Sequence, residues 1–332
     1  GRERIEGAQV WVVKIGSAVL TRDGVGIDAR GIDGWCKQIS VLLNDGKKVA
    51  LVTSGAVAEG FRRLGFTERP DSIHELQAAA AVGQMGIVQA YEKSFRHHSR
   101  RTALVLLTHD DLSDRQRYLN ARGTLRTLLN YGIVPVINEN DSVATDEIQL
   151  GDNDTLAARV ASLVSADVLV LLTDQKGLHE DDPRVRPDAP MVSECSAFDS
   201  KLDAMVGSGS GALGRGGMVT KLEASRYAAR AGCHTVIANG REQGILSAIA
   251  NGRNVGTILT ADVAPLDARK QWIAAQVQSA GGITLDAGAV KAVLERGVSV
   301  LAVGVTDVQG NFGRGDVVRI TGPDGVEVGK GL

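Results

Sequence analysis

Residues 10–17 read VWVVKIGS, an almost unbroken apolar run of strand length that ends in a lysine, an isoleucine and two small residues. A strand buried on both faces of a sheet has this pattern. Similar runs recur along the chain at Lys48–Val52, Thr102–Leu107, Ile133–Ile137, Val168–Leu172 and His234–Ala238. We therefore predict that these segments, with Val10–Ile15, form strands of one sheet.

Segments with apolar residues at helical spacing separate these runs, at Leu76–Phe95, Gln116–Leu129, Thr155–Val164 and Thr220–Ala231. Strands that alternate with helices predict an α/β fold, a three-layer α/β/α sandwich in which helices cover both faces of a mostly parallel sheet. Ligands of such sheets bind beyond the carboxyl ends of the strands. Functional residues are therefore expected just after each run.

The strand–helix rhythm changes after about residue 255. A short run at 256–260 and the segment GGITLD at 281–286 lead into a helical stretch at Ala287–Arg296, and brief apolar runs follow at Val298–Val303, Val317–Ile320 and Val326–Val328. This pattern predicts a small, mainly β domain with one helix. Since 332 residues suffice for two domains, we expect domains over residues 1–262 and 275–332.

Composition excludes several classes of protein. The 37 Lys+Arg against 39 Asp+Glu argue against nucleic-acid binding through bulk positive charge, and 4% aromatic residues argue against a base-stacking surface. The three cysteines form no C-x-x-C pair, which fits reduced thiols in a cytoplasmic protein. No apolar run reaches the roughly 18–20 residues of a membrane span, and the charged first residues lack the apolar middle of a signal peptide.

The ends of the first two runs suggest an anion site. Lys14 can point its ammonium into the crevice, and Gly16 lets a backbone N–H approach a phosphate closely. An ordinary lysine at a strand edge is the alternative. After the second run, the small residues Ser54 and Gly55 precede a helix whose first N–H groups can bind an anion, although a plain helix N-cap would read the same.

Polar residues crowd the end of the fourth run. INEND at 137–141 is followed by GDND at 151–154, and seven Asp, Glu or Asn side chains in two short stretches are too many for simple turns. A solvated acidic loop is the alternative. Asp and Asn at this position can hold an ammonium, bond polar groups of a substrate or orient a lysine.

A glycine-rich loop, GSGSGALGRGGMVTK at 207–221, leads into a helix and is expected to place Lys221 in the first turn. It contains G-x-G-x-x-G, but the dinucleotide fingerprint needs a strand before it, and Leu202–Val206 has a helical pattern. The chain also lacks G-x-x-x-x-G-K-[ST]. Phosphates would then be held by separate glycine loops together with Lys14 and Lys221.

Together these stretches resemble the amino acid kinase family, and within it the members that phosphorylate the γ-carboxylate of L-glutamate. VVKIGSAVLT, LVTSGAVAEG, LLTDQKGL and GRGGMVTKLEA carry the likeness, and INEND followed by GDND is its specific part. Residues 275–332 resemble a PUA domain through GGITLDAGAVKAVLERGVSVLAVGV and GNFGRGDVVRI. That domain normally runs beyond the position of Leu332, so we expect one shortened at its C-terminal end.

The resemblance implies L-glutamate and ATP as substrates, with Mg²⁺ held mainly through the nucleotide phosphates rather than by protein ligands. It implies catalytic roles for Lys14 and Lys221, which would flank the transferred phosphoryl group, and for Asp154, which would orient both lysines. Ser54, Asp141 and Asn153 would bind L-glutamate. The residues implied in ATP binding are Lys14, Gly16, Gly55, Thr173, Asp174, Arg215, Gly216, Gly217, Met218 and Lys221, with the two early glycines supplying backbone donors.

The resemblance further implies a homo-oligomer, a dimer or a tetramer, and feedback inhibition by proline. Proline keeps the α-carboxylate and a cationic α-nitrogen but lacks the γ-carboxylate. The polar loop Ser142–Leu150, which carries Asp146 and Glu147, is the segment expected to close differently over the two ligands. An ordinary surface loop is the alternative.

Two other functions stay open. A sister kinase of the family could act on acetylglutamate, aspartate, carbamate or UMP, although INEND with GDND and the second domain favour glutamate. An RNA-binding role through the PUA-like domain is the other alternative. Residues 256–332 hold 7 Lys+Arg and 8 Asp+Glu, so this domain has no overall basic footprint.

Overall fold

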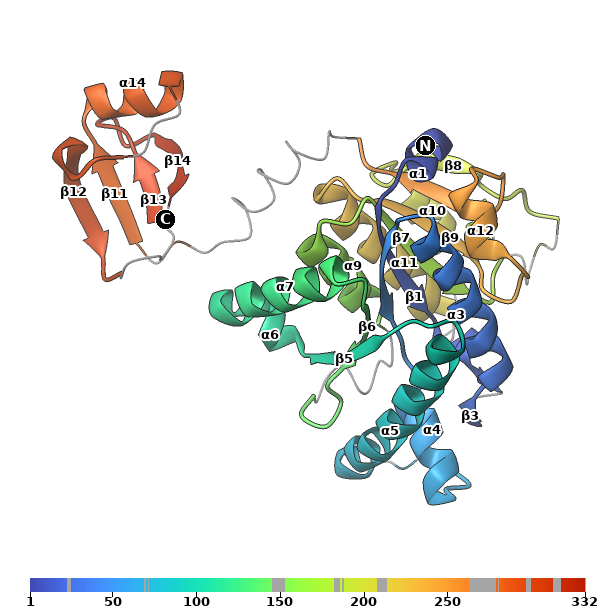
Figure 1. The fold of residues 1–332 in the computed structure, drawn as a ribbon. Coiled ribbons are helices and arrows are strands. Elements are labelled where there is room, and N and C mark those ends of the chain that lie inside the picture. The colour runs from blue at the N-terminus through green and yellow to red at the C-terminus, as the bar shows by residue number, and fades with distance from the viewer. Residues whose placement is uncertain are drawn as a thin grey trace. The chain divides into compact units, whose positions relative to one another are not determined.

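The computed structural model describes residues 1–22, 25–68, 70, 72–144, 153–181, 186, 188–207, 214–262, 279, 281–296, 300–312 and 318–331. The chain forms two compact units, Gly1–Pro265 and Leu266–Leu332 (Figure 1). This division falls between the two domains expected from the sequence. Their exact limits stay a prediction, since residues 263–278 lie outside the described part.

The larger unit is built on an eight-stranded sheet with the order β5-β6-β4-β1-β7-β9-β10-β8. Neighbouring strands run parallel except β9 and β10, which are antiparallel. The predicted α/β class with a mostly parallel sheet is therefore confirmed. The strands are β1 Val10–Ile15, β4 Lys48–Val52, β5 Thr102–Leu107, β6 Val134–Glu139, β7 Val168–Thr173, β8 Glu194–Ser196, β9 His234–Asn239 and β10 Thr257–Thr260.

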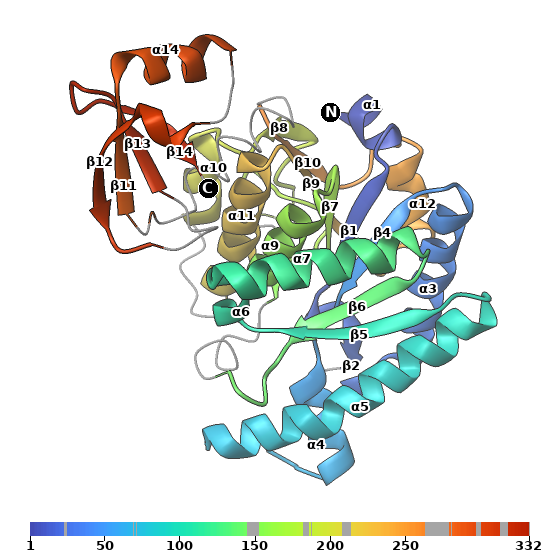
Figure 2. The same cartoon turned by 60° about the vertical axis from the view of Figure 1, so that its left-hand side comes forward.

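Helices cover both faces of this sheet. Figures 1 and 2 show α3 and α12 on one side and α7, α9 and α11 on the other, in agreement with two separate apolar cores. The longer helices are α3 Ala29–Asn44, α4 Ala56–Leu64, α5 Ile73–His97, α7 Arg115–Asn130, α9 Asp154–Val164 and α11 Gly214–Arg230. The shorter elements are α1 Arg2–Glu6, α2 Ser17–Leu20, β2 Thr21–Arg22, β3 Val25–Ile27, α6 His109–Ser113, α10 Lys201–Gly207 and α12 Ile245–Ala250.

The alternation of side chains along β1 decides where its lysine points. Trp11, Val13 and Ile15 lie in the core on the α3 side, whereas Val12 lies in the core on the α9 side. Side chains two residues apart on a strand share a face. Lys14 is therefore on the same face as Val12 and points toward the layer that contains α9.

Helices α4 and α5 pack backbone against backbone. A Cβ added to Gly60 would lie 1.8 Å from the carbonyl oxygen of Ala79, and one added to Gly83 would lie 1.8 Å from that of Ala56. Only glycine permits so close an approach. This contact holds the first turn of α4, which directly follows β4, against the middle of α5.

Two of the element boundaries that differ from the prediction bear on the site. Strand β6 extends to Glu139 because Leu106 and Leu107 of β5 pair with Asn138 and Glu139, so these two polar residues belong to the strand rather than follow it. Helix α11 begins at Gly214 instead of near Thr220. Lys221 therefore lies two turns inside the helix, and its placement in the first turn was wrong.

In the described residues of the smaller unit, a four-stranded sheet with the order β12-β11-β13-β14 is accompanied by the helix α14, in agreement with the predicted mainly β domain. Its elements are β11 Gly281–Leu285, α14 Ala287–Arg296, the 3-10 turn η1 Ala302–Gly304, β12 Val305–Gly310, β13 Val318–Thr321 and β14 Glu327–Gly331. The expected strand at Val298–Val303 was wrong: within its described residues the chain makes the 3-10 turn, and the strand starts at Val305.

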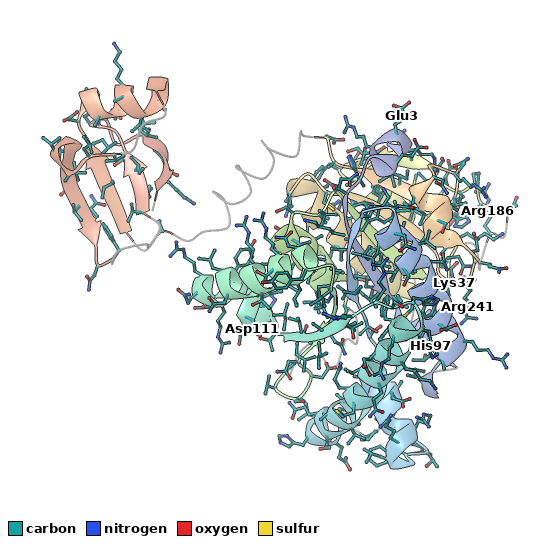
Figure 3. All side chains as sticks on the ribbon, viewed as in Figure 1. Glu3, Lys37, His97, Asp111, Arg186 and Arg241 are labelled. Atoms are coloured by element: carbon teal, nitrogen blue, oxygen red, sulfur yellow. The ribbon has the colours of Figure 1, made fainter. Side chains whose placement is uncertain are left out.

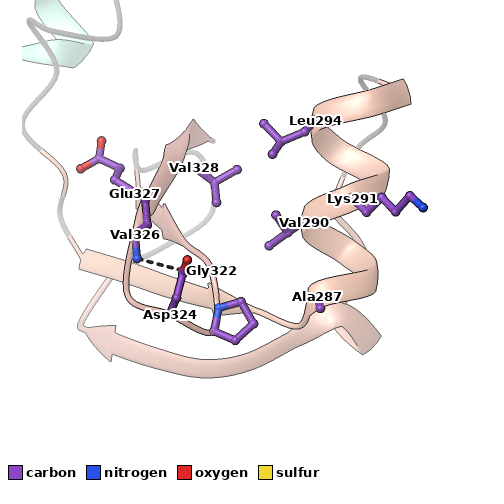
Figure 4. A pocket seen from close by; sticks show the side chains of 10 residues that line it. Ala287, Val290, Lys291, Leu294, Gly322, Asp324, Val326, Glu327 and Val328 are labelled. Atoms are coloured by element: carbon purple, nitrogen blue, oxygen red, sulfur yellow. Dashed lines mark hydrogen bonds between the residues drawn. The ribbon is translucent and has the colours of Figure 1, made fainter.

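A hollow of about 540 Å³ lies in this unit between α14 and the turn from β13 to β14. Figure 4 shows Val290 and Leu294 of α14 facing Val328, while Lys291 points away. The described charged residues at its rim, Lys291 and Asp324 among them, are exposed. Nothing in the described lining offers a buried polar side chain for a ligand.

Candidate active site

The predicted site residues meet at the carboxyl edge of four neighbouring strands. In the sheet, β6 lies beside β4, β4 beside β1, and β1 beside β7. Lys14 is paired with Val52 of β4, and Ile15 is paired with Leu172 of β7. This register brings the segments that follow all four strands to one edge, where parallel sheets bind their ligands.

A buried cluster of charge lies at this edge. The Nζ of Lys14 is 2.7 Å from Oδ1 of Asp154, and the Nζ of Lys221 is 2.9 Å from Oδ2. Asp154 is completely buried, and the two lysines are 3% and 8% exposed. By contrast, the charged side chains of Glu3 and Arg186 project into solvent (Figure 3).

The two ammonium groups keep the Asp154 carboxylate ionised. Burial by itself would raise the pKa of Asp154, but the charges and hydrogen bonds of Lys14 and Lys221 outweigh it and hold that pKa well below its usual value. Among the described residues, one carboxylate faces two ammonium groups, which gives this part of the site a net positive charge in a nearly dry place. Such a site suits an anion.

Helix α11 supplies the second lysine and a supporting hydroxyl. Lys221 also donates to the carbonyl oxygen of Gly217 at 3.0 Å, one turn earlier in the helix. Thr220 donates its hydroxyl to Oδ2 of Asp154 at 3.2 Å. The ammonium of Lys221 is thereby held between a carboxylate and a helix carbonyl.

A neutral network adjoins the charged cluster, because Asn153 immediately precedes Asp154. The Nδ2 of Asn153 donates to the carbonyl oxygen of Thr53 at 2.6 Å and to Oδ1 of Asn138 at 2.7 Å. The hydroxyl of Ser54 donates to the carbonyl oxygen of Ile15 at 2.9 Å. Ser54 and Asn153, both expected to bind L-glutamate, thus lie at the same strand ends as Lys14 and are buried.

The two early glycines have different backbone roles. The N–H of Gly16 donates to the carbonyl oxygen of Leu172 at 3.0 Å, so it is already used within the sheet, and we correct the expectation that it donates to a phosphate. A Cβ there would lie 3.0 Å from that same oxygen and 3.8 Å from the Nζ of Lys14, so the glycine gives clearance. Gly55 has φ +84° and starts α4, whose first N–H groups lack intrahelical acceptors.

The remaining residues expected to bind ATP are only partly described. Thr173 ends β7 and donates its hydroxyl to Oδ1 of the exposed Asp174 at 3.1 Å. Met218 packs against the core on the α9 side. For Arg215 and Gly216 the description is limited to the backbone, which is in the first turn of α11.

The acidic segments are likewise described in part. Asp141 is half-buried in the turn after β6. The first two residues of GDND and the residues Asp146 and Glu147, which the sequence marks for proline inhibition, lie outside the described residues.

The sequence reasoning did not single out four residues that take part in these networks. Thr53 and Asn138 directly follow predicted strands, so their position alone could have marked them as candidates. Thr220 lies next to a predicted lysine. Gln84 is in the middle of α5 and accepts a hydrogen bond from Asn138, and nothing in its local sequence signals this.

The described residues also bear on membrane-spanning helices, metal-binding clusters and disulfide bonds. None of the described helices is both long and apolar enough to cross a bilayer. In the described ranges no three His, Cys, Asp or Glu side chains are grouped so that they could hold a metal ion. Cys36, Cys195 and Cys233 are free thiols.

Comparison with known families matches both units. The model of the amino acid kinase family matches residues 9–239, and that of the PUA domain matches residues 281–332. The first match covers most of the chain and all the residues of the charged cluster.

Individual proteins agree with this result. A protein named glutamate 5-kinase from Thioalkalivibrio sulfidiphilus is 58% identical over 331 residues, which is 100% of this chain and 88% of that protein. One of the same name from Ectopseudomonas mendocina is 57% identical, over 100% of this chain and 89% of that protein. A solved UMP kinase from Bacillus anthracis matches with a TM-score of 0.53 and 13% identity, over 77% of this chain and 97% of that one, which shows a shared fold alone.

Proposed function

The chain belongs to the amino acid kinase family, and we propose that it transfers the γ-phosphoryl group of ATP to the γ-carboxylate of L-glutamate. The product is L-glutamyl 5-phosphate, and the reaction is the first step of proline biosynthesis. The observation that carries this proposal is the buried Lys14–Asp154–Lys221 cluster in a chain 55–58% identical to proteins named glutamate 5-kinase.

The chemistry of the acceptor agrees with this cluster. A γ-carboxylate has a pKa of about 4.3 and is already ionised at neutral pH, so it needs no general base. What the reaction needs is alignment and stabilisation of charge on the migrating phosphoryl group. Lys14 and Lys221 supply that positive charge from two different elements, and Asp154 holds both ammonium groups in place.

ATP with Mg²⁺ fits the residues that are present. Both oxygens of Asp154 are used by lysines, so we propose that Mg²⁺ is held by the nucleotide phosphates and waters, as is usual for this ion. Bound Mg²⁺ would neutralise phosphate charge. The nucleotide would lie where Gly16 leaves clearance and near the first turn of α4 after Gly55. Thr173, Asp174 and residues 215–218 would line the rest of its site.

The neutral network would bind the amino-acid end of L-glutamate. Ser54 and Asn153 lie on the two segments that adjoin Lys14 and Asp154, and Asp141 follows β6 at the same edge. Hydroxyl, amide and carboxylate groups can bond an α-ammonium and an α-carboxylate. Glutamate would then extend its γ-carboxylate toward the two lysines.

Release of ADP with different acceptors tests this assignment. Purified protein is given MgATP and, in turn, L-glutamate, acetylglutamate, aspartate, carbamate or UMP, and acyl phosphate is trapped with hydroxylamine. We expect L-glutamate to give the highest kcat/KM and a hydroxamate. A higher kcat/KM with another acceptor would assign the chain to a sister reaction of the family.

Inhibition by proline is proposed on the same basis. Proline can occupy the groups that hold the amino-acid end of glutamate and has no γ-carboxylate to accept a phosphoryl group. Initial rates across a glutamate series, with and without millimolar proline, should show competitive inhibition that is weakened by substitution of Asp146 or Glu147. Inhibition that glutamate cannot overcome would indicate a separate site.

Two further properties stay proposals that rest on the family. We propose a homo-oligomer, a dimer or a tetramer, which light scattering of the purified chain measures directly. We also propose a cytoplasmic location, with which three free thiols agree.

A further inference from the structure

A chain of buried amides runs from α5 to the start of α9. The Nδ2 of Asn138 donates to Oε1 of Gln84 at 2.7 Å, and Oδ1 of Asn138 accepts from Nδ2 of Asn153 at 2.7 Å. All three residues are buried: Gln84 and Asn153 are each 8% exposed, and Asn138 is 1% exposed. These hydrogen-bonded amides link the middle of the long helix α5 to Asn153, a residue proposed to bind the substrate at the start of α9.

The contact of Asn153 with Thr53 fixes the direction of both hydrogen bonds between the three amides. The carbonyl oxygen of Thr53 can only accept, so Asn153 must turn its Nδ2 toward it. The second hydrogen of that Nδ2 goes to Asn138, which must therefore present Oδ1 to Asn153 and Nδ2 to Gln84. Gln84 in turn must present Oε1.

This direction leaves a buried donor unused. The Nε2 of Gln84 is buried and has no hydrogen-bond partner among the described residues. Turning the amide of Gln84 would not help, since Nε2 would then face Nδ2 of Asn138. A buried donor without a protein partner is costly, and this orientation of Gln84 is set by its contact with Asn138.

The consequence for the site lies at Asn153. Both hydrogens of its Nδ2 are used, by Thr53 and Asn138, and a ligand can therefore meet only its Oδ1. An amide oxygen accepts from a donor such as an ammonium and gives no hydrogen bond to a carboxylate.

We propose that Gln84 is a positioning residue of the acceptor site: by accepting from Asn138 it holds Oδ1 of Asn138 against Nδ2 of Asn153, so that both hydrogens of that Nδ2 stay engaged and only Oδ1 of Asn153 faces the α-ammonium of the substrate. This inference rests on the proposed function. The backbone next to Gln84 packs closely against α4, because a Cβ at Gly83 would lie 1.8 Å from the carbonyl oxygen of Ala56.

Selectivity for the α-ammonium is the property to measure. L-Glutamate is compared with glutarate, which has both carboxylates and no amino group, in the wild type and in Gln84→Met and Gln84→Leu, two apolar replacements of different shape. Loss of one buried neutral hydrogen bond should raise the KM for glutamate about 3- to 10-fold, lower the preference for glutamate over glutarate by a similar factor, and leave the KM for ATP unchanged. Gln89→Met, at an exposed position of the same helix, is the matched control and should behave as the wild type.

A double-mutant cycle separates positioning from general destabilisation. If Gln84 acts through Asn153, Gln84→Met should change the KM for glutamate less than about 2-fold in an Asn153→Ala background. Additive effects, or an unchanged preference for glutamate over glutarate, would overturn the role of Gln84. Absence of turnover of L-glutamate by the wild type would instead overturn the proposed function, and this inference with it.

Discussion

Asn153 and Asp154 are adjacent in the chain, yet each begins a polar network of a different kind. Asp154 joins two lysines in a cluster of charged side chains. Asn153 joins a backbone carbonyl and two further amides in a network without charge. Both networks are buried, and they begin at the N-cap and at the first residue of α9.

The difference teaches which kinetic constant each network should control. Charge placed where charge moves acts on the transition state and therefore on kcat. Neutral groups that hold the unreacting end of a substrate act mainly on binding and on selectivity between substrates. The boundary between the two effects would then lie between two consecutive residues.

The largest effect is expected from the lysines. Lys14→Met and Lys221→Met each remove a positive charge from the migrating phosphoryl group while they keep most of the side-chain volume. By analogy with arginine fingers, kcat should fall about 10³-fold or more. Steady-state rates at saturating ATP and glutamate measure it, and a variant that keeps more than about a tenth of the wild-type kcat would remove that lysine from the mechanism.

Asp154→Asn should affect the stability of the fold as well as the rate. It leaves two buried ammonium groups without their shared partner, which should lower the free energy of unfolding by about 3–5 kcal/mol at pH 7. Because the pKa of Asp154 is lowered in the folded chain, its ionised form stabilises the fold above about pH 4, and this contribution is lost as the pH falls toward the lowered value.

Denaturant unfolding of wild type and Asp154→Asn at several pH values measures this dependence. The difference in stability between the two proteins should be constant from pH 7 to about pH 5 and should shrink below about pH 4. A difference that does not change with pH would mean that Asp154 does not carry its charge in the folded chain.

The residues proposed to bind L-glutamate should give a smaller effect on a different constant. Ser54→Ala, Asp141→Ala and Asn153→Ala each delete a polar partner of a charged ligand, at about 1.5–3 kcal/mol per hydrogen bond. The KM for glutamate should rise by about one to two powers of ten, with little change in the KM for ATP. Equal increases in both KM values would place these residues elsewhere than in the glutamate pocket.

The smallest effect is expected from the second unit. Every residue of both networks lies before residue 225, so a chain that ends at residue 262 should keep kcat within about 3-fold of the full-length value. Circular dichroism establishes that the shortened chain is folded. If that folded chain shows no turnover at saturating substrates, the chemistry requires the C-terminal unit.

The sequence was informative where local patterns act alone. Val10–Ile15 and Lys48–Val52 were predicted to the residue, because a strand buried on both faces is apolar along its whole length. Lys14, Asp154 and Lys221 were singled out from their positions after predicted strands and from a family likeness. The structure brings these three residues into contact.

The features that the sequence did not predict depend on contacts with residues that are distant along the chain. The end of β6 is set by its pairing with β5: Asn138 and Glu139 belong to the strand because they pair with residues of β5. The N–H of Gly16 was expected to be available, but the neighbouring strand β7 supplies its acceptor. Gln84 belongs to the site only because α5 packs where its side chain meets β6, and a helical pattern cannot reveal such a meeting.

The most direct test of this division compares Lys221→Met and Asn153→Ala in one hydroxamate assay, with the rate measured across the full range of L-glutamate concentration. The account predicts a loss of about 10³-fold in kcat for Lys221→Met, and for Asn153→Ala a rise of about one to two powers of ten in the KM for glutamate with kcat little changed. If both variants change the same constant by similar factors, the two networks do not divide the work, and the account is wrong.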